Sequence, residues 1–161
     1  MELKIKSKME LDDYIKFNLF CHRKTILIWI AIVCIGIVIV FREYNIYYRL
    51  LGCIFFSIFY LLLCEFDIKV KSKKGYNSDK LMQEECEFIV NENGIIEKTS
   101  KGEARIEFSD ILKFEEDIYS IYIFIGKFRA YVIPKRYITA EEQKMIKEII
   151  EIGKNDKKLN S

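Results

Sequence analysis

The sequence predicts an α+β membrane protein. A two-helix transmembrane hairpin is joined to a small antiparallel β-sheet or barrel, and a C-terminal amphipathic helix closes that sheet. Three patterns carry this prediction: a nearly charge-free apolar stretch at residues 25–64, period-two alternation from residue 85 onward, and an apolar stripe of helical spacing after Thr139.

Two apolar segments predict the membrane hairpin. Residues 25–41 contain no charge and reach roughly 26 Å as a helix, close to the thickness of a hydrocarbon core. Residues 50–64 are shorter, but counted from Tyr44, with Arg49 directing its guanidinium to the interface, the second helix reaches roughly 31 Å. The alternative is a buried hairpin in a soluble domain. The rest of the chain offers too little protein to wrap around such a hairpin.

The distribution of basic residues predicts the orientation. Lysines and arginines cluster before the first segment and after the second, whereas the turn holds only Arg42 and Arg49. The positive-inside rule therefore places both termini in the cytoplasm, in a two-pass protein of the cell membrane. Basic and tyrosine side chains at the segment ends are the expected interface anchors: Arg23, Lys24, Arg42, Tyr44, Tyr47, Tyr48 and Arg49.

Composition excludes several function classes. A net charge of +2 over 161 residues is too small to predict nucleic-acid binding. The five cysteines show no CxxC spacing, and we interpret Cys34 and Cys53 as small apolar fillers between the two helices. His22 is the only histidine, and we interpret it as an interfacial, non-catalytic residue.

The segments flanking the hairpin are less regular. Residues 1–24 are expected to form an N-terminal strand, which is a candidate to add to the sheet edge, and a juxtamembrane helix. Ser7 and Glu10 form a capping box that predicts a helix start near Lys8. Residues 65–84 form a basic linker, or a helical extension leading off the membrane. Its lysines are either a plain topology signal or a contact to anionic lipid: Lys71, Lys73 and Lys74.

Short strands with regular turn signals predict the domain at residues 85–153. Asn93-Gly94 and Gly126-Lys127 mark hairpin turns, and Pro134 stops the last strand. Thr139 and Glu142 form a second capping box that opens the amphipathic helix. Gly153 is expected to end this helix, leaving residues 154–161 as a disordered tail.

Three segments of this domain resemble a known family. They are residues 91–95 (NENGI), residues 108–111 (FSDI) and residues 130–137 (AYVIPKRY), and together with the layout of the chain they resemble the YcxB-like family of small bacterial membrane proteins. The resemblance implies a two-helix anchor that carries a cytoplasmic domain similar to pleckstrin-homology (PH) barrels. The resemblance does not indicate any particular activity. This sequence has Phe108 where the family commonly has tryptophan.

No motif in the sequence indicates catalysis. The acidic clusters at residues 84–85 and 115–117 do not converge on one point, because adjacent residues of a strand face opposite sides. Phosphate-binding glycine loops, metal-ligand spacings and nucleophile elbows are missing from the sequence. We therefore assign no catalytic or metal-binding residue and no cofactor, and a membrane-bound hydrolase is a minor alternative.

Two functional hypotheses follow. In the first, the protein is a membrane-anchored, non-catalytic interaction module whose sheet domain binds a protein partner through a sheet edge or a groove. In the second, it senses the envelope or binds anionic lipid headgroups. Basic residues near the end of the sheet are the candidate lipid or partner contacts: Lys127, Arg129, Lys135 and Arg136. The plainer interpretation of Lys135 and Arg136 is that they are exposed turn residues.

Overall fold

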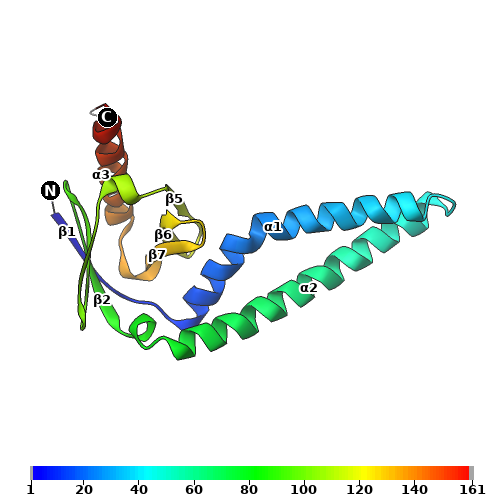
Figure 1. The fold of residues 1–161 in the computed structure, drawn as a ribbon, viewed down its shortest axis with the longest axis horizontal. Coiled ribbons are helices and arrows are strands. Elements are labelled where there is room, and N and C mark those ends of the chain that lie inside the picture. Colours follow the sequence, from blue (N-terminus) through cyan, green and yellow to red (C-terminus); the bar gives the residue numbers. More distant parts are fainter. Residues whose placement is uncertain (1, 160–161) are drawn as a thin grey trace. The chain divides into compact units, whose positions relative to one another are not determined.

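The computed structural model describes the backbone of residues 2–159 and the side chains of residues 2–153. The chain divides into two compact units, Tyr14–Gly75 and the combination of Met1–Asp13 with Tyr76–Ser161. Figure 1 shows the elements in order: β1 (Glu2–Lys8), α1 (Leu11–Val40), α2 (Ile46–Ser78), η1 (Leu81–Gln83), β2 (Glu85–Asn91), β3 (Gly94–Thr99), β4 (Gly102–Ile106), η2 (Phe108–Asp110), β5 (Lys113–Glu116), β6 (Ser120–Gly126), β7 (Arg129–Pro134), η3 (Lys135–Tyr137) and α3 (Ala140–Leu159).

The helices α1 and α2 form the predicted hairpin, and both are long and apolar enough to span a membrane. Their apolar spans are not buried within the protein. Leu27 is 64% exposed and Leu51 is 65% exposed, whereas a core helix of a soluble protein buries such side chains. This exposure favours a membrane over the alternative of a soluble helical core.

Contacts between the two helices are made by small polar side chains and thiols. Asn18 Nδ2 donates to Ser72 Oγ at 3.1 Å, and Cys34 Sγ lies 3.5 Å from Ser57 Oγ. Cys53 Sγ donates to the carbonyl of Cys34 at 3.8 Å. The prediction that Cys34 and Cys53 lie between the helices is therefore confirmed, and none of the five cysteines, all of which lie in the described part of the chain, forms a disulfide.

The start of α2 differs from the prediction, and the segment after the hairpin takes one of its two predicted forms, a helical extension. Tyr44 lies in the turn, because α2 begins at Ile46, where Asn45 Oδ1 caps the helix by accepting from Tyr47 N at 3.1 Å. The basic segment 65–84 is largely a continuation of α2, which ends at Ser78. Two ion pairs of i,i+4 spacing, Glu65 with Lys69 and Asp67 with Lys71, stabilise this extension.

The predicted capping box at Ser7 is wrong. Strand β1 continues through Lys8, and the Ser7 hydroxyl lies 3.6 Å from Cys86 Sγ instead of facing a helix. The helix begins at Leu11, where the carboxylate of Asp13 accepts from Glu10 N at 2.9 Å. Pairing with a neighbouring strand therefore prevailed over the local capping signal.

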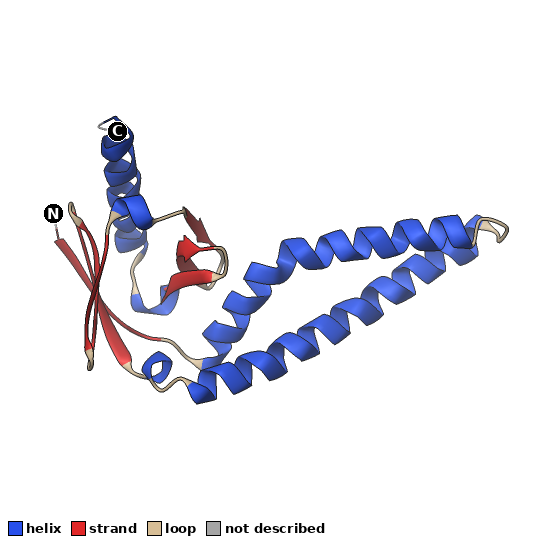
Figure 2. Ribbon diagram, viewed as in Figure 1, coloured by secondary structure: helices blue, strands red, loops and turns tan. Residues whose placement is uncertain are grey.

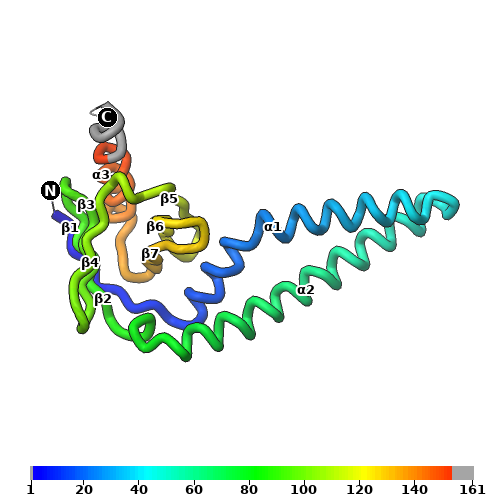
Figure 3. The backbone as a smooth tube through the Cα atoms, in the orientation of Figure 1, coloured from blue at the N-terminus to red at the C-terminus, as the bar shows by residue number. Residues whose placement is uncertain are grey.

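The other unit contains two antiparallel sheets and α3 (Figure 2). One sheet has the order β1-β2-β3-β4 and the other β5-β6-β7. The N-terminal strand adds to the sheet as expected, with Leu3 opposite Val90 and Ile5 opposite Phe88. Figure 3 shows this pairing between segments that the whole hairpin separates in the sequence.

A closed barrel, one of the two forms predicted, is not formed. The chain leaves the first sheet through η2, where Glu107 and Asp110 cap each other's backbone, so the ladder is interrupted between β4 and β5. Strands β1 and β7 are edges of different sheets. The core lies between the sheets and α3, around Ile95, Ile121 and Ile146.

The C-terminal helix confirms one prediction and corrects another. Thr139 Oγ1 accepts from Glu142 N at 3.2 Å, while Glu142 Oε2 accepts from Thr139 N at 2.7 Å, which is the predicted capping box. Gly153 does not end the helix, since α3 continues to Leu159. A Cβ at this glycine would collide with the ring of Phe108, so Gly153 is a close-packing position. The end of the predicted tail, residues 160–161, lies outside the described residues.

Candidate functional site

The predicted contact Arg136 is held by a buried carboxylate. Its Nη1 and Nη2 donate to Oδ1 and Oδ2 of Asp13, both at 2.7 Å, and Nη2 also donates to the Lys8 carbonyl at 3.3 Å. The Asp13 side chain is only 3% exposed. This bidentate pair raises the pKa of Arg136, chiefly through its hydrogen bonds to Asp13. Arg136 therefore ties the first turn of α1 to the end of β7.

The other predicted cations of the sheet unit do not form one patch with Arg136. Lys135 Nζ donates to Glu116 Oε2 at 2.8 Å, so it also has a carboxylate partner. Lys127 lies in the turn before β7, with its Nζ 5.2 Å from the centroid of the Phe128 ring, and Arg129 opens β7. The six residues of β7 separate the cations at its start, Lys127 and Arg129, from the cations that follow its end by roughly 20 Å.

The predicted contacts and anchors of the hairpin unit flank the apolar parts of α1 (Leu11–Val40) and α2 (Ile46–Ser78) or lie in the turn between them. Lys73 and Lys74 are exposed on α2, and Lys71 pairs with Asp67 at 2.7 Å. Arg23 lies over the ring of Phe20 at 3.8 Å. The remaining anchors comprise exposed side chains and one partly buried arginine: Lys24, Arg42, Tyr44, Tyr47, Tyr48 and Arg49.

The residues of the two acidic clusters make separate local contacts. Asp117 accepts from Tyr119 N at 2.7 Å, Ser120 N at 2.8 Å and the Tyr122 hydroxyl at 2.8 Å, so it closes the turn between β5 and β6. Glu84 is bonded to the Ser100 hydroxyl. Over residues 2–153, the structure brings together no group of three or more side chains suited to hold a metal ion.

His22 is held within its own helix. Its Nδ1 lies 2.8 Å from the carbonyl oxygen of Asn18, so Nδ1 carries the proton and donates. This bond holds the ring against the preceding turn of α1.

A groove in the sheet unit brings together residues that the sequence analysis did not predict to form a site. Its volume is about 300 Å³, at the lower end of ligand-site volumes. The lining comes from η1, from β2, β3 and β7, and from the chain around them: Met9, Leu81, Met82, Glu84, Cys86, Phe88, Glu97, Thr99, Ala130, Tyr131 and Val132.

The groove runs along a sheet edge. Three consecutive β7 residues line it, Ala130, Tyr131 and Val132, although alternate residues of a strand face opposite sides. The groove must therefore follow the backbone edge of β7, and β7 is the last strand of its sheet among the described strands. Such an edge can pair with an additional strand.

Residues 90–150 match the family model described as YcxB-like protein. The resemblance expected from the sequence is thereby confirmed over this segment. The search of curated proteins found no match, and the search of solved structures also found none. The YcxB-like segment includes Glu97 and the β7 side of the groove, whereas Cys86, Phe88 and the hairpin lie before it.

Glu97 dominates the electrostatics of the groove. Burial alone raises the pKa of its carboxyl group, and among the described residues no hydrogen bond or ion pair offsets this burial. Burial also raises the pKa of the Tyr131 hydroxyl and of the Cys86 thiol, with Glu97 contributing to both. The lining residues include no lysine or arginine, so the YcxB-like segment contributes an acidic, otherwise largely apolar wall.

The sequence does contain a signal for Glu97. Ile95, Glu97 and Thr99 share one face of β3, because their spacing is two residues, and Ile95 is fully buried at 0% exposure. Glu97 lies opposite Phe88 in the β2–β3 register. A glutamate on the core-facing side of a strand, paired with a buried phenylalanine, is the pattern that would have identified the groove.

Proposed function

We propose that the protein is a membrane-anchored, non-catalytic interaction module, and that the groove beside β7 binds a protein partner. The observation that carries this proposal is the half-buried Glu97, which has no hydrogen-bond or ion-pair partner among the described residues. It lies in a largely apolar groove along the edge of β7, and no described strand pairs with that edge. A carboxylate kept in such a place without a counter-ion lowers stability. Recognition of a partner is the function that offsets this loss.

The groove fits a particular kind of segment. An extended peptide can add to the β7 edge through backbone hydrogen bonds and place alternate side chains into the groove. Phe88, Tyr131 and Val132 favour an apolar side chain. Glu97 favours a lysine or arginine next to it, because the pair would remove the cost of an isolated buried charge.

The location belongs to the same proposal. The basic residues that flank the hairpin favour both termini in the cytoplasm of a bacterial cell, in the plasma membrane. In the sheet unit, a four-stranded sheet is followed by a three-stranded sheet and a C-terminal helix. This order supports the PH-like interpretation, in which the hairpin is inserted after the first strand. The groove would then be presented to cytoplasmic proteins.

Anionic lipid is the second candidate. Lys73 and Lys74 are exposed on α2, beyond its apolar span, and favour contact with an anionic surface. Lys135 and Arg136 contribute less to this alternative, since carboxylates already pair with both.

Site-specific crosslinking of the full chain in cells tests the groove. A photoreactive benzoylphenylalanine replaces Leu81 or Ala130 in the groove, and Lys144, whose side chain is 80% exposed on α3, serves as the control position. We expect protein adducts at the two groove positions that weaken when Glu97→Gln is added. Adducts of equal yield at all three positions, or adducts with lipid alone, would contradict the proposal.

A further inference from the structure

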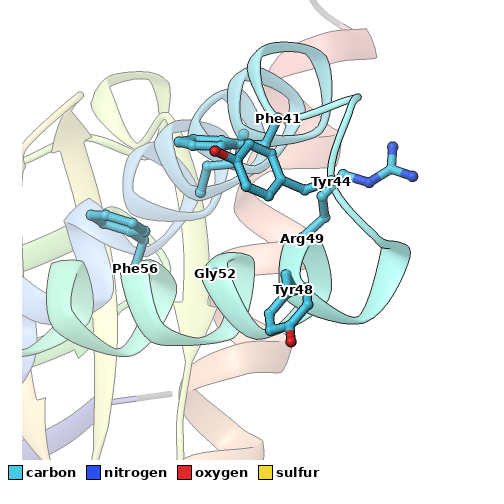
Figure 4. Close-up of a pocket in the computed structure, with 7 residues that line it drawn as sticks. Phe41, Tyr44, Tyr48, Arg49, Gly52 and Phe56 are labelled. Atoms are coloured by element: carbon cyan, nitrogen blue, oxygen red, sulfur yellow. The ribbon is translucent and has the colours of Figure 1, made fainter.

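A second cavity lies between α1 and α2 beside their turn, as Figure 4 shows. Its volume is about 440 Å³, within the range of small-molecule sites. Aromatic side chains form most of its wall, and the rings of Phe41 and Tyr44 meet edge to face at 5.8 Å. Phe56 lines the α2 side of the space.

Among the described residues that line the cavity, Arg49 is the one with a charged side chain. Its Nε is buried without a hydrogen-bond partner among the described residues. Figure 4 shows its guanidinium directed away from Phe56. The acidic residue of the turn, Glu43, is 88% exposed and pairs with Arg42 at 3.9 Å. The site therefore joins an apolar space to one cation that lacks a counter-ion in the described structure.

We propose that this cavity binds one acyl chain of an anionic phospholipid whose phosphate pairs with Arg49. The apolar wall matches a hydrocarbon chain, and a guanidinium can hold phosphate oxygens through two parallel hydrogen bonds. Both helices are long and apolar enough to span a membrane, where phospholipid is the abundant amphiphile. This inference concerns the hairpin only and stands apart from the groove of the sheet unit.

Gly52 offers a way to fill the cavity without changing its charge. It lines the space, and a Cβ added to it would lie 3.7 Å from Ile37 Cγ2, an ordinary contact. A longer side chain at this position would extend into the space that the acyl chain needs. Gly52→Leu therefore separates loss of volume from loss of charge.

Native mass spectrometry of the full chain in detergent micelles tests the proposal. The probes are dioleoyl-phosphatidylglycerol, dioleoyl-phosphatidylcholine and oleate, each titrated separately. We expect the first phosphatidylglycerol to bind at least fivefold more tightly than phosphatidylcholine. Arg49→Gln should abolish this preference and Gly52→Leu should weaken binding of both lipids, while Arg42→Gln, the matched control in the turn, should change either affinity less than twofold.

Three results would overturn the proposal. Equal affinity for the two phospholipids would show that the lipid charge plays no part in binding. An equal loss of phosphatidylglycerol affinity in Arg42→Gln and Arg49→Gln would show a diffuse attraction by the charges of the turn. Tighter binding of oleate than of phosphatidylglycerol identifies a different ligand. Arg49→Lys keeps the charge and should retain part of the preference, so it keeps the test valid if Arg49→Gln loses its helical circular dichroism.

Discussion

The two units of this protein use the same side chains in opposite ways. In the sheet unit, Ile121 and Ile133 are completely buried at 0% exposure, whereas in the hairpin Ile54 is 58% exposed and Phe55 is 62% exposed. The first unit gains stability by removing apolar surface from water, and the second presents that surface to a solvent that is itself apolar. Chemically equal substitutions should therefore have unequal effects in the two units.

The largest expected difference comes from a matched pair of isoleucines. Ile121→Ala should destabilise the sheet unit by about 2–5 kcal/mol, because it leaves a cavity in a close-packed core. Ile54→Ala, on the outer surface of the hairpin, should change stability by less than about 1 kcal/mol, since lipid or detergent replaces the lost contacts. Urea unfolding of the full chain in nanodiscs, followed by far-ultraviolet circular dichroism, measures both. Equal losses would mean that the hairpin surface is packed against protein.

A smaller effect separates two neighbouring cations. Arg136→Gln leaves the buried carboxylate of Asp13 without its partner. We expect the free energy of unfolding to fall by about 2–3 kcal/mol. This is less than for a fully buried ion pair, because the Arg136 side chain is 41% exposed. Lys135→Gln breaks the pair with Glu116, whose side chain is 45% exposed, and should cost less than about 1 kcal/mol. The same denaturation experiment compares them, and the reverse order would show that Asp13 is not a structural partner.

Two helical glycines sharpen the comparison between the units. Gly153→Ala should destabilise the sheet unit by about 1–3 kcal/mol, because its Cβ would collide with the ring of Phe108. Gly36 in α1 has nothing within 4 Å of an added Cβ, so Gly36→Ala should be neutral or stabilise the helix by up to about 1 kcal/mol. Thermal unfolding of both variants gives the comparison, and a neutral Gly153→Ala would show that α3 can move away from Phe108.

The smallest effect is a pH dependence confined to the groove. Burial raises the pKa of Glu97 above its unfolded value of 4.5, so the folded state binds the proton more tightly than the unfolded state. Stability should therefore be greatest below the unfolded pKa and fall as the pH rises through the folded pKa. Glu97→Gln should remove this fall and stabilise the protein at pH 7.

The control for this pH dependence is Glu103→Gln, at an exposed position of β4. Free energies of unfolding measured between pH 4 and pH 8 compare the two variants. A pH profile that Glu97→Gln leaves unchanged would show that the Glu97 carboxylate is solvated in the folded protein.

Local patterns were enough for the elements and their types. Apolar run length identified the hairpin, period-two alternation identified the strands, and the Thr139–Glu142 capping box located the start of α3. These signals depend on neighbours only a few residues apart in the sequence, so they can be read without knowing the fold.

Contacts between distant residues decided the rest. Ser7 resembles a helix cap in the sequence, but β1 pairs with β2 at this position. Gly153 resembles a helix stop, but it packs against Phe108. Arg136 is exposed, as one interpretation predicted, but its pairing with Asp13 joins residues far apart in the sequence and was not predicted. The groove likewise depends on β3 and β7, which belong to different sheets.

The sequence by itself therefore determined the hairpin, the strands and the helices, because the forces that form them act over one or two turns or one strand. Only the tertiary structure decided that no described strand pairs with the edge of β7. It also decided that Glu97 and Arg49 line two cavities without an ion-pair partner among the described residues. Whether a charged side chain has an ion-pair partner depends on residues that lie far away in the sequence and fold next to it. A local sequence pattern contains no information about those residues.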